Sequence, residues 1–284
     1  MANHESDDEE LQVQFPHRMR TLSTSALDAL KQFYTERDAR AEQFAKLQAQ
    51  AEEQHAAGQA KPLSMEAFTE DWNESQFWYS DETASLLARQ LLNGATADTM
   101  IAVVSAPSVF VALKNILNAA GPGEPQPKLL LLEHDNRFAV FPEFVFYDFA
   151  QPLKLPGSHA SKVDSFDSAH LKGTCDRIIC DPPFLSEDCQ TKAALTVRWL
   201  SKLPSSSSSS PSSSDGQQQQ QQQPRLIVCT GERMQDVVTR VYRSFGLRTT
   251  DYDPMHARGL SNEFYCYANF ESADWGWRGG KGRT

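Results

Sequence analysis

The chain has 284 residues, of which 40% are hydrophobic and 10% aromatic, and its formal net charge at pH 7 is −10. This length and composition predict one sizeable core with some chain left over, and they exclude a wholly disordered protein. No apolar run approaches the roughly 18 residues of a membrane span, and the acidic first ten residues resemble neither a secretory signal nor a mitochondrial presequence. We therefore expect no membrane association.

The acidic charge also bears on partners and location. Five acids and no Lys or Arg stand among the first ten residues, and the rest of the chain is acidic as well. Nucleic-acid binders usually show the opposite sign, so a basic protein partner is favoured over nucleic acid. The five cysteines are odd in number and form no C-x-x-C pair, and the histidines lack metal spacing, so we expect no disulfide framework and no metal site. A reducing cytoplasm is the simplest location, with the cysteines as small buried residues.

In chain order, residues 1–22 are predicted to form a disordered acidic tail and residues 23–63 an N-terminal helical extension. The main folded domain is predicted at 64–273. It is interrupted at 204–224 by a Ser-rich and then Gln-rich segment that cannot bury a core and is expected to be a flexible insertion. Residues 274–284 are predicted to form a flexible tail. The oligomeric state cannot be inferred.

Within the domain, helices and apolar strands alternate. A helix is expected at 82–92, capped by Ser80 or Asp81 and ended by Asn93-Gly94. Strands are predicted at 100–106, 128–135, 143–149, 175–181 and 225–231, with helices at 108–121, 186–203 and 232–246, and two further strands at 247–253 and 263–272. Continuous apolar strands separated by helices predict an α/β, Rossmann-like parallel sheet with helices on both faces. The last two strands predict an antiparallel C-terminal hairpin.

Acidic residues follow three of these strands. Ligands of open α/β sheets bind beyond the carboxyl ends of the strands. There Glu133 could accept both hydroxyls of a ribose, and Asp148, one strand further, the exocyclic amine of an adenine. The pattern predicts a nucleoside ligand.

The third of these acids is Asp181, which opens the stretch Asp181-Pro182-Pro183-Phe184 at the end of the predicted strand 175–181. Proline has no N–H and a fixed φ, so the turn presents carbonyl acceptors without competing donors. With the Asp181 carboxylate it suits one task, the holding of an amino group so that its lone pair points at an electrophile. Phe184 supplies a flat apolar wall for a base or for lysine methylenes. The alternative is an ordinary Pro-Pro turn.

This turn resembles the motif of class I, seven-strand methyltransferases, which use S-adenosylmethionine. A narrower resemblance rests on "SQFWYSDETA", "VSAPSVF", "EHDNRF", "FVFYDF", "CDPPFLSEDC" and "SNEFYCYANF", which are similar to the eukaryotic elongation factor 1A lysine methyltransferase family. It implies a cytoplasmic enzyme that methylates a lysine of elongation factor 1A. It also implies that Asp181, Pro182, Pro183 and Phe184 bind the target amine, that Glu133 holds the cofactor ribose and that Asp148 holds the adenine. We expect further cofactor contacts from Trp78, Tyr79, Ser80, Ser105, Ala106, Pro107 and Asp181.

The first strand departs from most such enzymes, because the usual Gly-x-Gly loop is replaced by Ser105-Ala106-Pro107-Ser108. Other residues should then help to seat the methionine end of the cofactor. The candidates form a lid or, alternatively, pack under the first helix: Trp72, Gln76, Phe77, Trp78, Tyr79 and Ser80.

The chemistry expected from this reading is attack of a neutral lysine amine on the sulfonium methyl, with water as the proton acceptor. The residues offer no convincing dedicated base, and His134 is better explained as a surface histidine. Asn262-Glu263-Phe264 could line the acceptor side or make hairpin contacts. Two other functions stay open: a nucleic-acid N6-adenine methyltransferase, which the turn satisfies equally, and a non-catalytic scaffold with the cofactor fold.

Overall fold

The computed structural model describes residues 63–65, 68, 70, 76–155, 171–202, 223–260 and 263–279, all of which belong to one compact unit, Gln50–Thr284. Several predictions concern residues outside these ranges. They are the acidic tail 1–22, nearly all of the helical extension 23–63, Trp72, most of the insertion 204–224, Asn262, and the last five residues of the chain.

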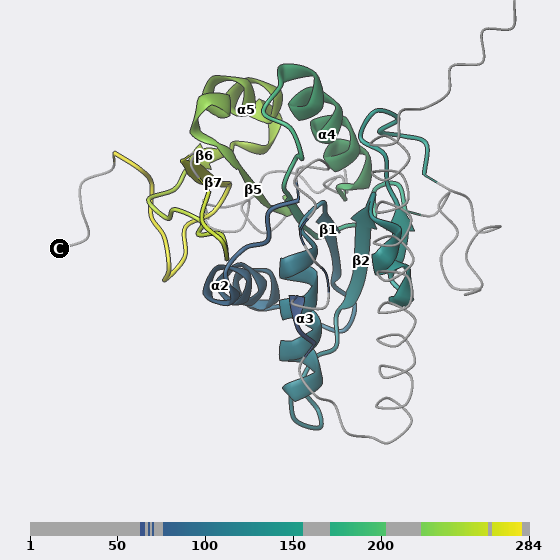
Figure 1. Ribbon diagram of the computed structural model, residues 1–284. Coiled ribbons are helices and arrows are strands. Elements are labelled where there is room, and N and C mark those ends of the chain that lie inside the picture. The colour runs from purple at the N-terminus through teal and green to yellow at the C-terminus, as the bar shows by residue number, and fades with distance from the viewer. Residues whose placement is uncertain are drawn as a thin grey trace, which may run out of the picture. The chain divides into compact units, whose positions relative to one another are not determined.

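A seven-stranded sheet organises the described part of the chain, in the order β3-β2-β1-β4-β5-β7-β6 (Figure 1). The first five strands in this order, β3, β2, β1, β4 and β5, are parallel, whereas β7 is antiparallel to both of its neighbours. The strands are β1 Met100–Val104, β2 Lys128–Glu133, β3 Phe144–Phe146, β4 Arg177–Cys180, β5 Arg225–Gly231, β6 Arg248–Thr249 and β7 Phe264–Ala268. The predicted antiparallel pair at the C-terminal edge is confirmed, and β7 is the strand that joins it to β5.

Helices cover both faces of the sheet, as predicted. Figure 1 shows α2 and α3 on one face and α4 and α5 on the other. The helices are α2 Asp81–Leu92, α3 Pro107–Ala119, α4 Glu187–Leu200 and α5 Gln235–Val241. The helix predicted at 82–92 is confirmed with its cap, because Oγ of Ser80 accepts the N–H of Thr83 at 3.2 Å. Among the described helices, none has the length and apolarity needed to cross a membrane.

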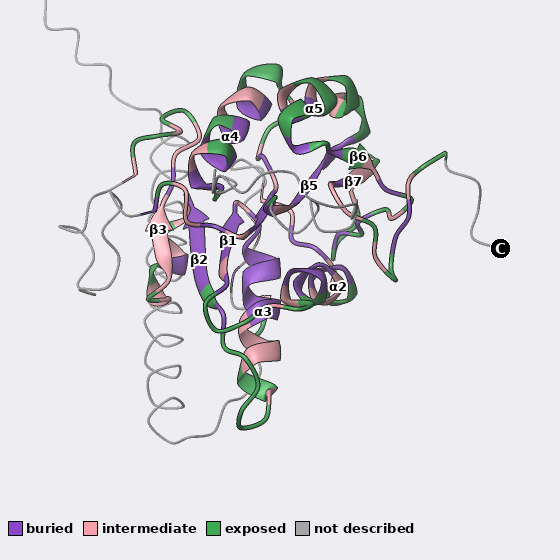
Figure 2. Cartoon of the chain, turned by 180° about the vertical axis from the view of Figure 1, so that it is seen from behind, coloured by how far each residue is buried: buried purple, intermediate pink, exposed green. Residues whose placement is uncertain are grey.

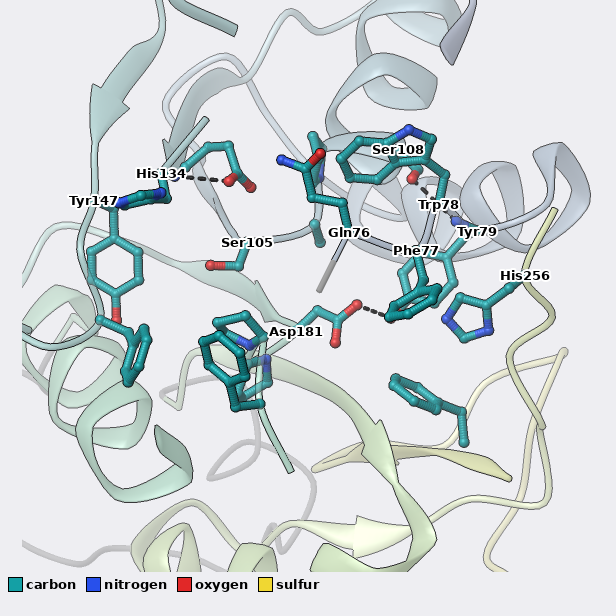
Figure 3. A pocket seen from close by; sticks show the side chains of 18 of the residues that line it. Gln76, Phe77, Trp78, Tyr79, Ser105, Ser108, His134, Tyr147, Asp181 and His256 are labelled. Atoms are coloured by element: carbon teal, nitrogen blue, oxygen red, sulfur yellow. Dashed lines mark hydrogen bonds between the residues drawn. The ribbon is translucent and has the colours of Figure 1, made fainter. Parts of the chain in front are cut away.

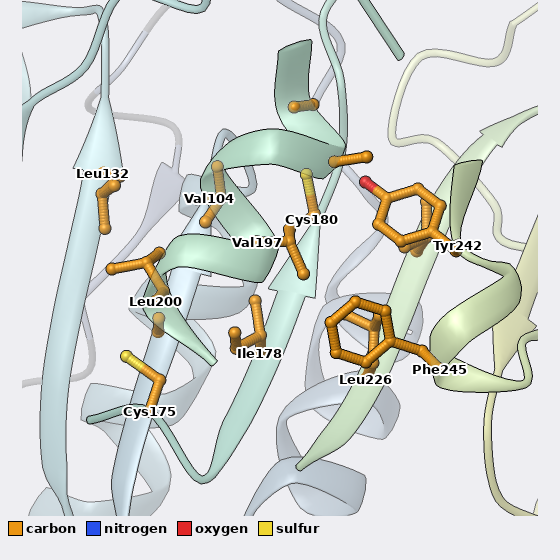
Figure 4. Close-up of a cluster of buried hydrophobic side chains, with 14 of the residues drawn as sticks. Val104, Leu132, Cys175, Ile178, Cys180, Val197, Leu200, Leu226, Tyr242 and Phe245 are labelled. Atoms are coloured by element: carbon orange, nitrogen blue, oxygen red, sulfur yellow. The ribbon is translucent and has the colours of Figure 1, made fainter. Parts of the chain in front are cut away.

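The core follows from the period-two alternation of strand side chains. Alternate residues of β1, β2, β4 and β5 point toward α4 and α5. Figure 4 shows Val104 and Ile178 near Val197 and Leu200, and Leu226 beside Phe245. The intervening residues face α2 and α3, so each strand is buried on both sides and its sequence is continuously apolar (Figure 2). All five cysteines are buried with free thiols, which confirms their prediction as small core residues.

Some elements are shorter than predicted. β3 ends at Phe146, and the expected helix 232–246 is divided into a 3-10 turn Glu232–Met234, the short α5, and a second 3-10 turn Arg243–Phe245. Four of the seven residues of α5 are β-branched, which restricts their χ1 angles in a helix and lowers helix propensity. Gly246, at φ +67°, then ends the segment.

The prediction of a flexible tail beginning at residue 274 is wrong for Asp274 to Gly279. Trp275 is fully buried, and its indole N–H donates to the carbonyl of Phe270 at 2.9 Å. Trp277 forms a β-bridge with Thr250, which extends the edge of the sheet. Burial of the large Trp275 ring removes enough apolar surface from water to order this segment.

Candidate active site

The strand register brings the predicted site residues to one edge of the sheet. Val104 of β1 pairs with Leu132 of β2 and with Cys180 of β4. The next residue of each strand therefore stands at the same level, and these residues are Ser105, Glu133 and Asp181. The strand order reverses between β1 and β4, so this edge is the topological switch point at which α/β proteins bind ligands.

A pocket of about 300 Å³ opens at this edge (Figure 3). Its volume lies at the lower end of the range typical of small-molecule sites. Eleven of the predicted site residues line it: Trp78, Tyr79, Ser105, Ala106, Pro107, Glu133, Asp148, Asp181, Pro182, Pro183 and Phe184. Ser105, His134 and Tyr147 lie on one side of Asp181, here called the strand-end side. On the other lie Phe77, Tyr79 and His256, here called the segment side.

Asp181 stands between these two sides. Its backbone N–H donates to the carbonyl of Val104 at 3.0 Å, which fixes the start of the proline turn against β1. The phenolic hydroxyl of Tyr79 donates to Oδ2 of Asp181 at 2.5 Å. The sequence did not predict this contact: the proline turn has no N–H donor of its own, but a donor from a distant segment occupies one carboxylate oxygen.

Burial makes ionisation of Asp181 costly. The carboxyl lines the pocket but lies deep among apolar side chains, and this burial raises its pKa to about 8. The hydrogen bond from Tyr79 opposes the increase, and the nearby carboxyl of Glu133 adds to it. A cation bound in the pocket would favour the ionised form, because an opposite charge nearby lowers the pKa of an acid.

Glu133 ends β2 with its carboxyl directed into the pocket. Oε1 accepts the backbone N–H groups of His134 at 2.8 Å and of Asp135 at 3.2 Å. Burial raises the pKa of Glu133 to about 7, and the two backbone N–H groups limit that increase. No hydrogen bond to Oε2 is found among the described residues, which leaves this oxygen available to a ligand hydroxyl.

Asp148 and His134 lie near the strand-end rim. Oδ1 of Asp148 accepts the N–H of Ala150 at 2.8 Å, which fixes the carboxylate at the end of β3. His134 is exposed, and its ring lies 5.2 Å from that of Phe146. Figure 3 places His134 well away from the carboxylate of Asp181, as expected of a surface histidine.

The loop after β1 compensates for its missing glycines. Ser105 has a φ of +54°, the left-handed conformation that glycine adopts most readily, and no other non-glycine residue in the described chain has a positive φ. The backbone therefore makes the turn into α3 that a glycine loop would make. The cost of holding a serine there is about 1–2 kcal/mol.

Residues 76–79 form one wall of the pocket, and Ser80 follows them at the start of α2. The backbone N–H of Ser80 donates to the carbonyl of Met255, and that of Ala257 donates to the carbonyl of Trp78, both at 2.8 Å. Gln76 is tied to the segment after β2, because its amide donates to Oδ2 of Asp135 at 2.9 Å. Trp78 lines the pocket and is also buried in the core. Its indole N–H donates to the carbonyl of Phe68 at 2.7 Å.

The prediction that Ser80 contacts the cofactor is not supported by its position. Its hydroxyl caps α2, and it is not among the described residues that line the pocket. A capping hydroxyl faces the helix N-terminus, whereas the neighbouring Tyr79 faces the pocket.

Sequence reasoning missed several lining residues, namely Tyr147, Phe149, Leu185, His256 and Leu260. His256 is the most informative, because its ring lies 5.0 Å from that of Tyr79 and 4.7 Å from that of Phe264. Burial lowers the pKa of His256 to about 4, so the imidazole is neutral near pH 7. No sequence signal links it to Asp181; the β-bridge between Tyr79 and His256 brings it into the pocket.

The geometry fits a nucleoside cofactor. A buried carboxylate with an available oxygen ends β2, a turn in the left-handed conformation ends β1, and the pocket between them is lined by aromatic and proline side chains. Together with the sheet order, these features define the class of Rossmann-like methyltransferases.

Comparisons with known proteins agree with this class. The family model described as "Probable N6-adenine methyltransferase" matches residues 70–272. The chain is 41% identical to protein-lysine N-methyltransferase EFM5 of Saccharomyces cerevisiae, over 90% of this chain and 94% of that protein. It is 34% and 31% identical to the EEF1A lysine methyltransferase 1 of Gallus gallus and of Homo sapiens, over 88% of this chain and 94% and 92% of those proteins. The chain belongs to this family of methyltransferases, and its cofactor is S-adenosylmethionine.

Proposed function

We propose that this protein transfers methyl groups from S-adenosylmethionine to the ε-amine of a lysine on translation elongation factor 1A. The observation that carries the proposal is the convergence in one pocket of Asp181, at the head of a rigid proline turn, and Glu133, at the end of β2. The names of the relatives support the acceptor, since three that the chain covers almost completely are called protein-lysine or EEF1A lysine methyltransferases.

The strand-end side would hold the cofactor. Glu133 would accept the ribose hydroxyls, Asp148 the adenine amine, and the loop Ser105 to Pro107 would lie against the methionine end. When bound, S-adenosylmethionine supplies an electrophilic methyl group on a positively charged sulfur. That charge would favour the ionised form of the nearby Asp181.

The Asp181 turn and the segment side would hold the acceptor. A neutral amine whose lone pair points at an electrophile has two N–H bonds left to donate. The carboxylate of Asp181 and the carbonyl of Pro182 are acceptors for these two bonds, and the rings of Pro183 and Phe184 would flank the lysine methylenes. Positioning of this kind can supply roughly 7–11 kcal/mol of a barrier.

The acceptor must also lose a proton, because a free lysine has a pKa of about 10.4. Apolar walls disfavour the ammonium form, and neutral His256 adds no positive charge to the segment side. Asp181 and Glu133 are assigned here to the amine and to the ribose, so water is the proton acceptor that we propose.

The acidic net charge of −10 suits a basic, lysine-bearing protein surface better than a polyphosphate. Since elongation factor 1A acts in translation, we propose that the enzyme works in the cytoplasm. The description of the family as N6-adenine methyltransferases favours a second candidate, transfer to adenine N6 in nucleic acid, because an exocyclic amine satisfies the same turn.

One experiment separates these candidates. The purified protein is incubated with methyl-labelled S-adenosylmethionine and, in parallel, with elongation factor 1A, DNA and RNA. Label in the factor alone, absent with Asp181→Ala, supports the proposal, and mass spectrometry of the factor from cells with and without the gene locates the lysine. Label in nucleic acid, with none in the factor, replaces it with the second candidate.

A further inference from the structure

The hydrogen bond between Tyr79 and Asp181 joins residues 102 positions apart and lies at the centre of the pocket (Figure 3). Tyr79 is 3% exposed, so its ring has little freedom to move away. Its backbone N–H donates to Oγ of Ser108 at 3.2 Å, and its β-bridge to His256 holds the chain on the other side. The phenol is therefore fixed by contacts with α3 and with the segment before β7.

The two oxygens of Asp181 are not equivalent. Oδ2 accepts the Tyr79 hydroxyl at 2.5 Å, whereas no hydrogen bond to Oδ1 is found within the described residues. Rotation of the carboxylate about its terminal torsion would break the Tyr79 contact. Tyr79 thus selects one oxygen for itself and leaves the other to whatever enters the pocket.

We infer that Tyr79 is a positioning residue of the transfer site, whose hydroxyl occupies Oδ2 of Asp181 and so directs Oδ1 to the acceptor amine. This inference rests on the proposed function for the identity of that amine. It also assigns Tyr79 to the acceptor rather than to the cofactor, which differs from the role expected from the sequence.

The surrounding charges bear on how Asp181 titrates. The titratable groups that face it are Tyr79 before α2, Glu133 at the end of β2, Cys180 on β4, Cys189 on α4, Cys229 on β5, and His256 across the pocket. Burial raises the pKa values of the Cys180 and Cys189 thiols, and contact with Cys266 raises that of Cys229, so these thiols are neutral near pH 7. Burial also raises the pKa of Tyr79, which therefore remains a donor. Of the groups named, Tyr79 is the one that lowers the pKa of Asp181.

The test is Tyr79→Phe, which removes only the hydroxyl. Three quantities are measured on the full chain: the pH profile of methyl transfer to elongation factor 1A, the affinity for S-adenosylmethionine by calorimetry, and the carboxyl ¹³C titration of Asp181, assigned with Asp181→Asn. We expect kcat at pH 7 to fall by about tenfold, the size of one lost hydrogen bond. The Asp181 midpoint should rise by on the order of one pH unit, because a bond that favours the charged form is gone. Cofactor affinity should stay within about twofold.

Tyr252→Phe is the matched control, since its half-buried hydroxyl donates to Oγ1 of Thr83 at 3.0 Å and Tyr252 does not line the pocket. It should leave all three quantities unchanged, and thermal unfolding confirms that both variants fold. An unmoved Asp181 midpoint overturns the inference, as does a loss of cofactor affinity without a change in that midpoint. If the wild-type protein methylates no elongation factor, the proposed function fails, whereas the ¹³C titration still decides whether Tyr79 controls Asp181.

Discussion

The two sides of the pocket are built in different ways. On the strand-end side, Ser105 and Tyr147 directly follow parallel strands and Glu133 ends one, and the register of β1 and β2 places Ser105 and Glu133 at one level. On the segment side, Phe77 and Tyr79 precede α2, and His256 precedes β7. No regular strand carries these three residues; they are joined by backbone hydrogen bonds between segments about 180 positions apart in the chain.

This difference separates features shared by the whole fold class from features specific to this protein. Any fold of this class presents residues at the carboxyl ends of its parallel strands, so the strand-end side follows from topology. The segment side depends on pairing between distant irregular segments, and such segments vary more readily than the sheet that supports them. We therefore expect cofactor affinity to depend on the first side and acceptor handling on the second. Asp181 lies between the two sides and would hold the acceptor amine.

The largest effect is expected from Asp181→Ala. It removes the carboxylate that would hold the amine and leaves the Tyr79 hydroxyl without its partner. Transfer to elongation factor 1A should fall by about 10² to 10³-fold, the range seen when one positioned polar group is lost from a transition state. Single-turnover kinetics at saturating cofactor measure this loss.

Cofactor affinity, measured by calorimetry on the same variant, is the control and should change by less than about fivefold. A variant that binds cofactor weakly but transfers at the normal rate once saturated would place Asp181 on the cofactor side instead, and the comparison between the two sides would not hold.

Glu133→Gln tests the strand-end side. The neutral amide is a poorer acceptor for ribose hydroxyls, so the Kd of S-adenosylmethionine should rise by about 10- to 100-fold, as expected for a lost hydrogen bond to a charged group. The kcat at saturating cofactor should change little. A fall in kcat without a change in Kd would contradict the assignment.

The difference in stability between the wild type and this variant should depend on pH, and its sign can be predicted. The pKa of Glu133 is about 7 in the fold and near 4.5 in the unfolded chain, so between these values the folded state holds the extra proton. Wild-type stability should therefore decline as pH rises through this window, by up to about 3 kcal/mol. The amide cannot ionise, so ligand-free Glu133→Gln should be more stable than wild type at pH 8 and similar to it near pH 4, as measured by urea unfolding.

Phe184→Ala tests the acceptor contribution of the proline turn. Phe184 is 39% exposed and its ring lies 5.4 Å from that of Phe149, so it can shield a lysine side chain at modest cost to the fold. The KM for elongation factor 1A should rise by about 3- to 10-fold, in line with an exposed cation–π or apolar contact. Cofactor Kd should not change. Leu195→Ala, on the exposed surface of α4, is the control, and an equal effect there would remove Phe184 from the acceptor site.

The sequence was informative where local pattern determines structure. Apolar runs fixed the parallel strands, and the residues after them identified Glu133 and Asp181 without knowledge of the fold. Pairing between distant segments could not be derived in this way. The bridge from Tyr79 to His256, the insertion of β7 between β5 and β6, and the burial of Trp275 all depend on contacts that no single stretch of sequence encodes.

The smallest effect is expected from Ser105→Gly, which tests whether the loop after β1 is held under strain. Ser105 has a φ of +54°, and glycine relieves about 1–2 kcal/mol there, whereas the greater freedom of glycine in the unfolded chain offsets about half of this gain. The free energy of unfolding should rise by about 0.5–1 kcal/mol. Ala106→Gly is the matched control, because Ala106 has a φ of −133° and gains no such relief, so it should lose about 0.5–1 kcal/mol. Equal losses in both variants, measured by urea unfolding, would show that the serine makes contacts that matter more than its conformation. Since the loop lies on the strand-end side, any accompanying change should appear in cofactor Kd and leave the KM for elongation factor 1A unaltered.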